Sequence, residues 1–150
     1  MLHPIQSRRL WSPGPLSRRE WLALLDGAAA VRQAALRNAA WQALRGRRVA
    51  LLCAPGAASA AAAFSGALAE AGASVTRLHS EAWRSSAGDK LPEAARLLGR
   101  LYDAIDCNDL PQRMVAQIER HAGVPVFNGL AQPDHPLHLL AEFQIGRAHV

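Results

Sequence analysis

Apolar residues recur at helical spacing over the first part of the chain. Ser17 and Glu20 have the spacing of a capping box, in which a serine hydroxyl and a glutamate each bond a free amide at the start of a helix. Behind them the apolar positions lie three or four residues apart, at Trp21, Leu24, Leu25, Ala28, Val31 and Ala35. This pattern predicts one long amphipathic helix from residue 17 to about residue 38, before a break at residues 45–47.

From residue 49 onward, short apolar runs alternate with helical patterns. The runs typical of strands cover residues 49–53, 75–78, 102–107 and 124–128. Helices are expected from Pro55-Gly56 to about residue 72, from 92 to 98 and from 111 to 121, and the polar stretch 80–89 predicts no element. A continuous apolar run such as 49–53 is typical of a strand buried on both faces of a parallel sheet. We therefore predict an α/β fold: a three-layer sandwich with a four-stranded parallel sheet flanked by helices, preceded by a long N-terminal helix.

The length of 150 residues suits one domain. We predict an irregular lead-in over residues 1–15, the domain over residues 16–144, and a non-native tail over residues 145–150. The tail, Ile145 to Val150, can be encoded by a DNA sequence that resembles a widely used sequencing adapter. We therefore expect a domain cut short in its last helix and a longer parent protein, against the alternative of a natural C-terminus.

Composition narrows the class of partner. The net charge of +5 is carried by arginine, with Lys90 as the one lysine, so it reflects composition or attraction to an anionic ligand. No basic run is interleaved with aromatic residues, and no apolar run is long enough to span a membrane, so neither nucleic acid nor membrane is an expected partner. Cys53 and Cys107 end strand-like runs and are expected to be packed thiols of a reduced, cytoplasmic protein. No cofactor is predicted.

Candidate chemistry follows the last predicted strand. The run Val124 to Asn128 ends in an Asn-Gly turn, and His135-Pro136 then opens a helical pattern. This arrangement delivers His135 to the edge of the sheet where open α/β folds bind their ligands. His138 lies one turn further, but no third ligand accompanies the two histidines, so no metal site is predicted. One glycine after the first strand also disfavours a dinucleotide site.

Several segments resemble a known family. Residues 97–106, Ala122 to Leu130, and His135-Pro136 with Leu139 to Glu142 are similar to the corresponding segments of ornithine carbamoyltransferases, in the aspartate/ornithine carbamoyltransferase family. Their order and spacing also agree, including residues 44–47 and 64–72. The resemblance covers about residues 16–144 and implies the N-terminal, carbamoyl-phosphate-binding half of such an enzyme.

The resemblance also implies which positions bind substrate. The family's Ser-Thr-Arg-Thr-Arg phosphate loop falls on Ala57, Ala58, Ser59, Ala60 and Ala61, and a further arginine falls on Asn108. In the family's His-Pro-x-Gln group, His135 is kept and His138 replaces the glutamine, which makes these two the implied catalytic positions. The implied partners are carbamoyl phosphate or a related small anion and, for the full-length protein, further copies in a trimer.

Three phosphate-facing arginines are therefore missing, and the phosphate site is expected to be degenerate. Charge-assisted hydrogen bonds contribute on the order of 1.5–3 kcal/mol each, so the loss should cost roughly three or more powers of ten in transition-state stabilisation. A helix dipole contributes about 0.3–1 kcal/mol and cannot replace them. Two classes remain: a carbamoyltransferase-like enzyme, whose isolated half is expected to be inactive, and a non-catalytic relative with a binding or assembly role.

Overall fold

The computed structural model describes residues 16–37, 41–56, 58–85, 89–130, 135 and 141; for residues 58–60 it describes the backbone alone. The chain divides into two compact units, one formed by residues 1–41 and 133–150 and the other by residues 42–132. Each unit is described by itself.

The first unit contains the long helix α1 (Arg18–Leu36). The predicted capping box is present: the Glu20 amide donates to the Ser17 hydroxyl at 3.3 Å, and the Ser17 amide donates to the Glu20 carboxylate at 2.8 Å. These two bonds satisfy amides that have no partner within the helix, which confirms the predicted start.

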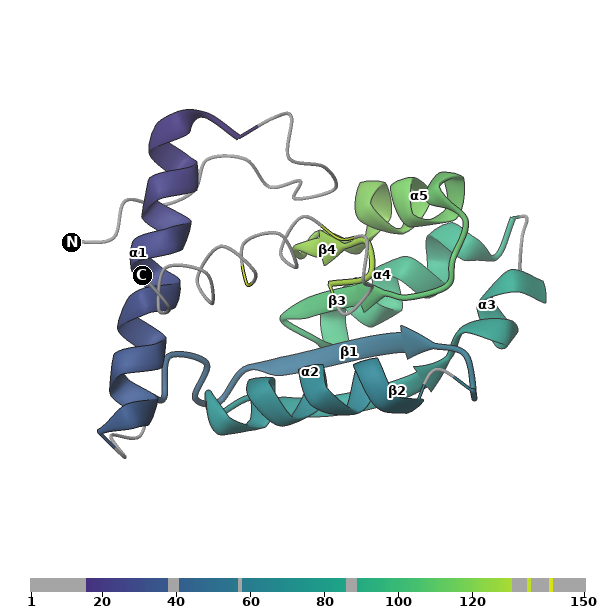
Figure 1. The fold of residues 1–150 in the computed structure, drawn as a ribbon. Helices are drawn as coiled ribbons and strands as arrows, with labels where there is room; N and C mark the ends of the chain where they lie inside the picture. The colour runs from purple at the N-terminus through teal and green to yellow at the C-terminus, as the bar shows by residue number, and fades with distance from the viewer. Residues whose placement is uncertain are drawn as a thin grey trace. The chain divides into compact units, whose positions relative to one another are not determined.

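The second unit is built on a parallel sheet with the strand order β2-β1-β3-β4 (Figure 1). Its strands are β1 (Arg48–Cys53), β2 (Ser74–His79), β3 (Ala104–Cys107) and β4 (Val126–Phe127). All four were predicted, but β3 and β4 are shorter than expected. β4 begins after Pro125, which has no amide to donate and contributes only its carbonyl, to the amide of Ile105 at 3.0 Å.

Helices lie on both faces of this sheet, as predicted. α2 (Ala58–Glu70) covers β1 and β2 on one face, where Phe64 and Leu68 pack against Val49 and Leu51 (Figure 1). The alternate residues of the strands, such as Leu52 and Ile105, point to the opposite face, where α4 (Leu91–Leu101) and α5 (Gln112–Ala122) lie.

Two helical predictions need correction. The polar stretch expected to lack an element contains a short helix, α3 (Ser80–Ser85), in which Ser80 is the one buried residue. Because a helix with so little apolar surface has no hydrophobic stripe, its periodicity is not visible in the sequence. α4 also runs three residues beyond its predicted end at 98. Gly99, in this extension, is a site of close helix contact: a Cβ at this position would lie 1.7 Å from the Ala122 carbonyl oxygen of α5.

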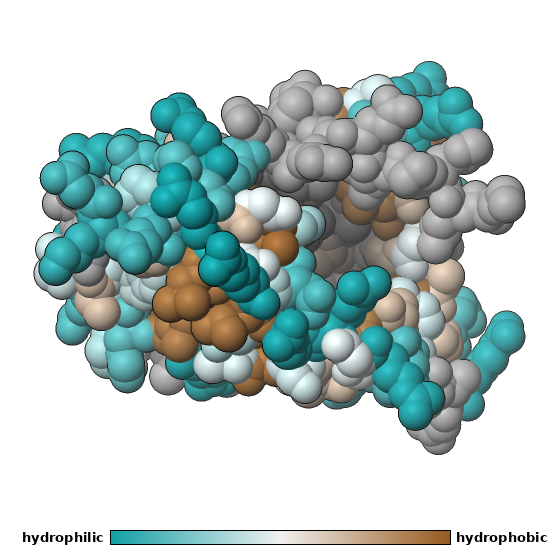
Figure 2. All heavy atoms as spheres, turned by 180° about the vertical axis from the view of Figure 1, so that it is seen from behind, coloured by the Kyte–Doolittle hydropathy of each residue, from teal (hydrophilic) through white to brown (hydrophobic). Residues whose placement is uncertain are grey.

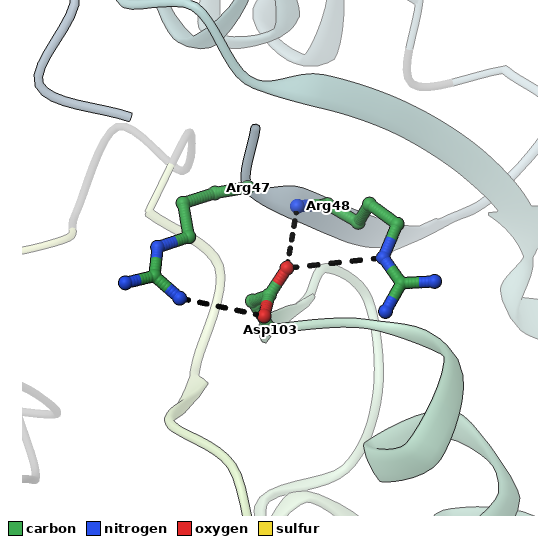
Figure 3. Close-up of polar contacts among 3 residues, drawn as sticks. All are labelled: Arg47, Arg48 and Asp103. Atoms are coloured by element: carbon green, nitrogen blue, oxygen red, sulfur yellow. Dashed lines mark hydrogen bonds and ion pairs between the residues drawn. The ribbon is translucent and has the colours of Figure 1, made fainter. Parts of the chain in front are cut away.

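The amino end of the sheet is held by one carboxylate. Asp103 accepts a hydrogen bond from the Arg48 amide at 2.8 Å, and its two oxygens lie 3.6 Å from Arg47 Nη1 and 3.9 Å from Arg48 Nε (Figure 3). Arg47 and Asp103 belong to two separate segments of the family resemblance. Their pairing gives these two residues a structural role, at the opposite end of the sheet from the candidate site.

Candidate functional site

The carboxyl ends of β1, β3 and β4 meet at one edge of the sheet, because all the strands are parallel. Ala54 follows β1, Asn108 follows β3 and Asn128 follows β4. In open parallel sheets this edge is where ligands bind. Which side chains the strands deliver there decides what the site can hold.

A buried carboxylate organises the ends of β3 and β4. Asp106 is 1% exposed, and its Oδ1 accepts hydrogen bonds from the amides of Gly129 at 2.9 Å and Leu130 at 3.0 Å. Its Oδ2 accepts from the side-chain amide of Asn108 at 2.9 Å. Gly129 has a φ of +73°, a conformation that suits glycine, so the turn and the carboxylate fix each other.

A second carboxylate lies between β1 and the loop after β3. Asp109 has a φ of +62°, and its Oδ2 accepts from the Ala54 amide at 3.4 Å. Arg84 of α3 donates to the carbonyl oxygen of Asp109 and so ties α3 to this loop. On the β3 side of β1, acidic groups therefore occupy positions near the strand ends.

Basic groups lie on the other side of β1. A cavity of about 180 Å³ opens there, lined by Cys53, Ala54, Pro55, Ala61, Arg77, Leu78 and His79. Arg77 Nε donates to the Ser65 hydroxyl of α2 at 3.4 Å. The next residue after His79 is Ser80, which is fully buried and whose hydroxyl has no partner among the described residues.

A larger cavity of about 540 Å³ lies on the same face of the sheet, beside α2. Its walls are mainly apolar, with Phe64, Leu68 and Phe127 among them, and it also contains Asp103 and Asp106. Both carboxylates have hydrogen-bonding or ionic partners in the strands and the segments beside them, so this cavity offers mostly hydrophobic contact.

Comparison with known proteins identifies the family. A sequence model of the aspartate/ornithine carbamoyltransferase carbamoyl-P binding domain matches residues 8–147. The chain belongs to this carbamoyltransferase family.

Individual relatives agree with this assignment. The catabolic ornithine carbamoyltransferase of Pseudomonas putida is 32% identical over 149 residues, which cover 99% of this chain and 44% of the relative. An ornithine carbamoyltransferase of Neisseria lactamica is 41% identical over 87 residues, or 58% of this chain and 33% of the relative. The chain therefore spans less than half the length of these relatives, and what it matches is the N-terminal half.

Solved structures show the same fold at lower identity. The ornithine carbamoyltransferase of Pyrococcus furiosus superimposes with a TM-score of 0.80 at 24% identity, covering 91% of this chain and 44% of that protein. The Thermus thermophilus enzyme gives a TM-score of 0.79 at 24% identity, covering 96% of this chain and 49% of that protein. The four-stranded parallel sheet with flanking helices is thus the carbamoyl-phosphate-domain fold.

The positions that the family resemblance predicts to bind phosphate do not all lie at one cavity, and several of their side chains lie outside the described residues. Ala61 is 3% exposed and lines the smaller cavity. Ala58, Ser59 and Ala60 form the first turn of α2, but their side chains, together with Ala57 and His138, lie outside the described residues. Asn108 is buried and bonded to Asp106, and His135 is buried in the first unit.

Several residues of this edge were missed from the sequence. Asp106 reads as an interior residue of an apolar strand, and Asp109 as an ordinary loop residue. Arg77 and His79 alternate along β2 with a two-residue period, which is the one signal that could have placed them on the same face.

Cys107 is a packed thiol, in agreement with the sequence. It is 1% exposed, and burial, with a smaller contribution from the charge of Asp106, raises the pKa of its thiol far above the ordinary value near 9. The thiol therefore stays protonated and cannot act as a nucleophile at neutral pH.

Over the described part of the chain, His, Cys, Asp and Glu side chains form no group of three or more that could hold a metal ion. Within the same residues, no helix is long and apolar enough to cross a membrane.

Proposed function

We propose that this chain is the carbamoyl-phosphate half of an ornithine carbamoyltransferase-type protein whose phosphate site is weakened. The family match over residues 8–147 supports the ligand class, carbamoyl phosphate or a related small anion. The relatives named ornithine carbamoyltransferase support ornithine as the second substrate, which the other half of the whole protein would bind.

The main support for a weakened phosphate site is the residue at position 108. This position corresponds to a phosphate-facing arginine of the family, and here it holds a neutral amide that donates to Asp106 at 2.9 Å. The Asp109 carboxylate, which accepts a hydrogen bond from the Ala54 amide, adds negative charge beside the end of β1. An incoming phosphate at this point would meet carboxylates where the family supplies guanidinium groups, which disfavours tight binding.

The catalytic roles in this proposal belong to two histidines. His135 would polarise the carbamoyl carbonyl, as its position in the family motif implies, and His138 would stand in for the glutamine beside it. The whole protein would act in the cytoplasm as a homotrimer, in arginine biosynthesis. Leu97 and Leu101 support self-association, because they lie one turn apart on α4 and are 56% and 47% exposed.

A second candidate is a non-catalytic family member with a binding or assembly role. The loss of cations at Ser59, Ala61 and Asn108 favours it, because these are the positions at which the family stabilises the leaving phosphate. Such a protein would retain the fold and the oligomeric state of the family but would not catalyse carbamoyl transfer.

One experiment separates the two candidates. The whole protein is titrated with carbamoyl phosphate by isothermal calorimetry, and citrulline formation from carbamoyl phosphate and ornithine is measured alongside. Weak binding with slow but ornithine-dependent turnover supports the enzyme proposal. Absence of both binding and turnover contradicts it and leaves the non-catalytic candidate.

A further inference from the structure

We propose that a small oxyanion of the phosphate type binds in the 180 Å³ cavity on the β2 side of β1, where the Arg77 guanidinium supplies positive charge and the His79 imidazole supplies a hydrogen-bond donor. The inference deepens the proposed function, because it names residues that would hold the anion at a site displaced from the family's own. It does not require that carbamoyl transfer takes place.

The register of the sheet brings the two basic residues together. Arg77 pairs with Leu51 and His79 pairs with Cys53, so both residues lie on the face of the sheet that α2 covers. Residues two apart on one strand point the same way, and both line the same cavity. The hydrogen bond from Arg77 Nε to Ser65 steadies the guanidinium, and no other partner is recorded for it among the described residues. Its two Nη groups are therefore available as donors to an anion.

The charge around the cavity favours an anion on this side. Among the described residues that line the cavity, none is acidic. On the other side of β1, by contrast, Asp109 bonds the Ala54 amide and Asp106 holds the β4 turn. The Arg84 guanidinium on that side already donates to the Asp109 carbonyl oxygen. Because the two carboxylates repel a phosphate, the β2 side is the more favourable of the two.

The size of the cavity fits a small ion. At about 180 Å³ it is smaller than the roughly 300–1,000 Å³ of ordinary small-molecule pockets, so a nucleotide would not fit. Ala61 forms part of the wall of the cavity. The family resemblance implies that other members carry an arginine at the corresponding position. The short side chain leaves room that an arginine would fill, while Arg77 supplies a guanidinium from the neighbouring strand.

The test is a set of titrations of the chain with inorganic phosphate and, separately, with carbamoyl phosphate. Arg77→Gln and the double variant Arg77→Gln/His79→Gln are compared with Arg77→Lys, which keeps the charge. Arg96→Gln is the control, because it removes an exposed arginine of α4 that does not line the cavity. Circular dichroism confirms that each variant is folded.

We expect Arg77→Gln to raise the Kd for inorganic phosphate about tenfold and the double variant to raise it further. Arg77→Lys should bind within a few-fold of the original chain, and Arg96→Gln should bind equally well. Carbamoyl phosphate should follow the same order, since the phosphoryl group is the shared chemistry.

Unchanged phosphate affinity in Arg77→Gln, or no phosphate binding by the original chain, would overturn the inference. In the first case the proposed function stands, because the anion then binds elsewhere on the chain. If Arg77→Gln weakens phosphate binding but the whole protein forms no citrulline, the inference holds and the proposed enzyme activity fails.

Discussion

At the scale of single residues, Asp106 shows how a buried charge can be a structural element of a candidate site. Among the described residues, its two oxygens accept hydrogen bonds from two backbone amides and from the Asn108 side chain. A buried carboxylate is tolerated when its hydrogen bonds are satisfied. The turn Asn128-Gly129-Leu130, which belongs to the family resemblance, is therefore held by a residue to which the sequence alone assigned no role.

Replacing Asp106 with alanine should be strongly destabilising. The amides of Gly129 and Leu130 would lose their acceptor, and each unsatisfied buried donor costs about 1–3 kcal/mol, so we expect a loss of about 2–6 kcal/mol in the free energy of unfolding. Urea denaturation followed by circular dichroism measures it. The exchange variant Asp106→Asn/Asn108→Asp keeps a side-chain oxygen at position 106 that accepts from both amides. Its side-chain amide at position 106 then donates to the carboxylate at position 108, the reverse of the original bond. It should recover much of the loss, and equal destabilisation of both variants would contradict this role.

Cys107 gives a prediction in alkaline solution. Burial raises the pKa of its thiol in the folded state above the ordinary value near 9. The folded state thus keeps a proton that the unfolded state loses above about pH 9, so this part of the stability is complete below pH 9 and declines as the pH rises further. The slope is up to about 1.4 kcal/mol per pH unit.

Urea denaturation between pH 8 and pH 10.5 tests this decline. Cys107→Ala should remove that part of the pH dependence, while the control Cys53→Ala retains it. A decline of equal steepness in Cys107→Ala and in the original chain would show that another group is responsible.

At the scale of elements, the sequence predicted the order and type of the strands and of the longer helices. Continuous apolar runs and capping signals are local, so they can be read without knowing the fold. The helix α3 was missed because it buries one residue, and α4 was predicted to end at residue 98, before Gly99, although it continues to Leu101. What glycine does there depends on α5, more than twenty residues away, and so could not be found from local spacing.

Gly99→Ala should therefore destabilise the packing of α4 on α5. The new methyl group would overlap the Ala122 carbonyl, and overpacking of this kind costs typically about 1–3 kcal/mol. Gly66→Ala in α2 is the matched control, since nothing lies within 4 Å of its Cβ position. The control should gain about 0.5–1 kcal/mol in urea denaturation, because alanine favours a helix over glycine. The same change in both variants would argue against close helix contact at Gly99.

At the scale of the whole molecule, family and fold are established. The sequence resemblance led to the same domain that the family comparison and the solved structures support. It pointed to missing arginines, but it did not indicate the carboxylates near them or the basic residues of β2, since those depend on which strands lie side by side.

Figure 2 shows a further property of the surface, a group of hydrophobic side chains among polar ones on the side opposite the view of Figure 1.

We propose that this carbamoyltransferase-family domain holds phosphate weakly because arginines are missing from the loop that leads into α2 and from its first turn. Ser59→Arg returns a guanidinium to a position where the family carries one, and Ser59→Gln adds a long polar side chain without charge. The most direct measurement is the Kd of the whole protein for carbamoyl phosphate, by isothermal calorimetry, in these two variants and in the original sequence. We predict that Ser59→Arg binds at least about tenfold more tightly than the other two, as expected for one charge-assisted contact. Micromolar binding by the original sequence, with no gain in Ser59→Arg, would contradict the account.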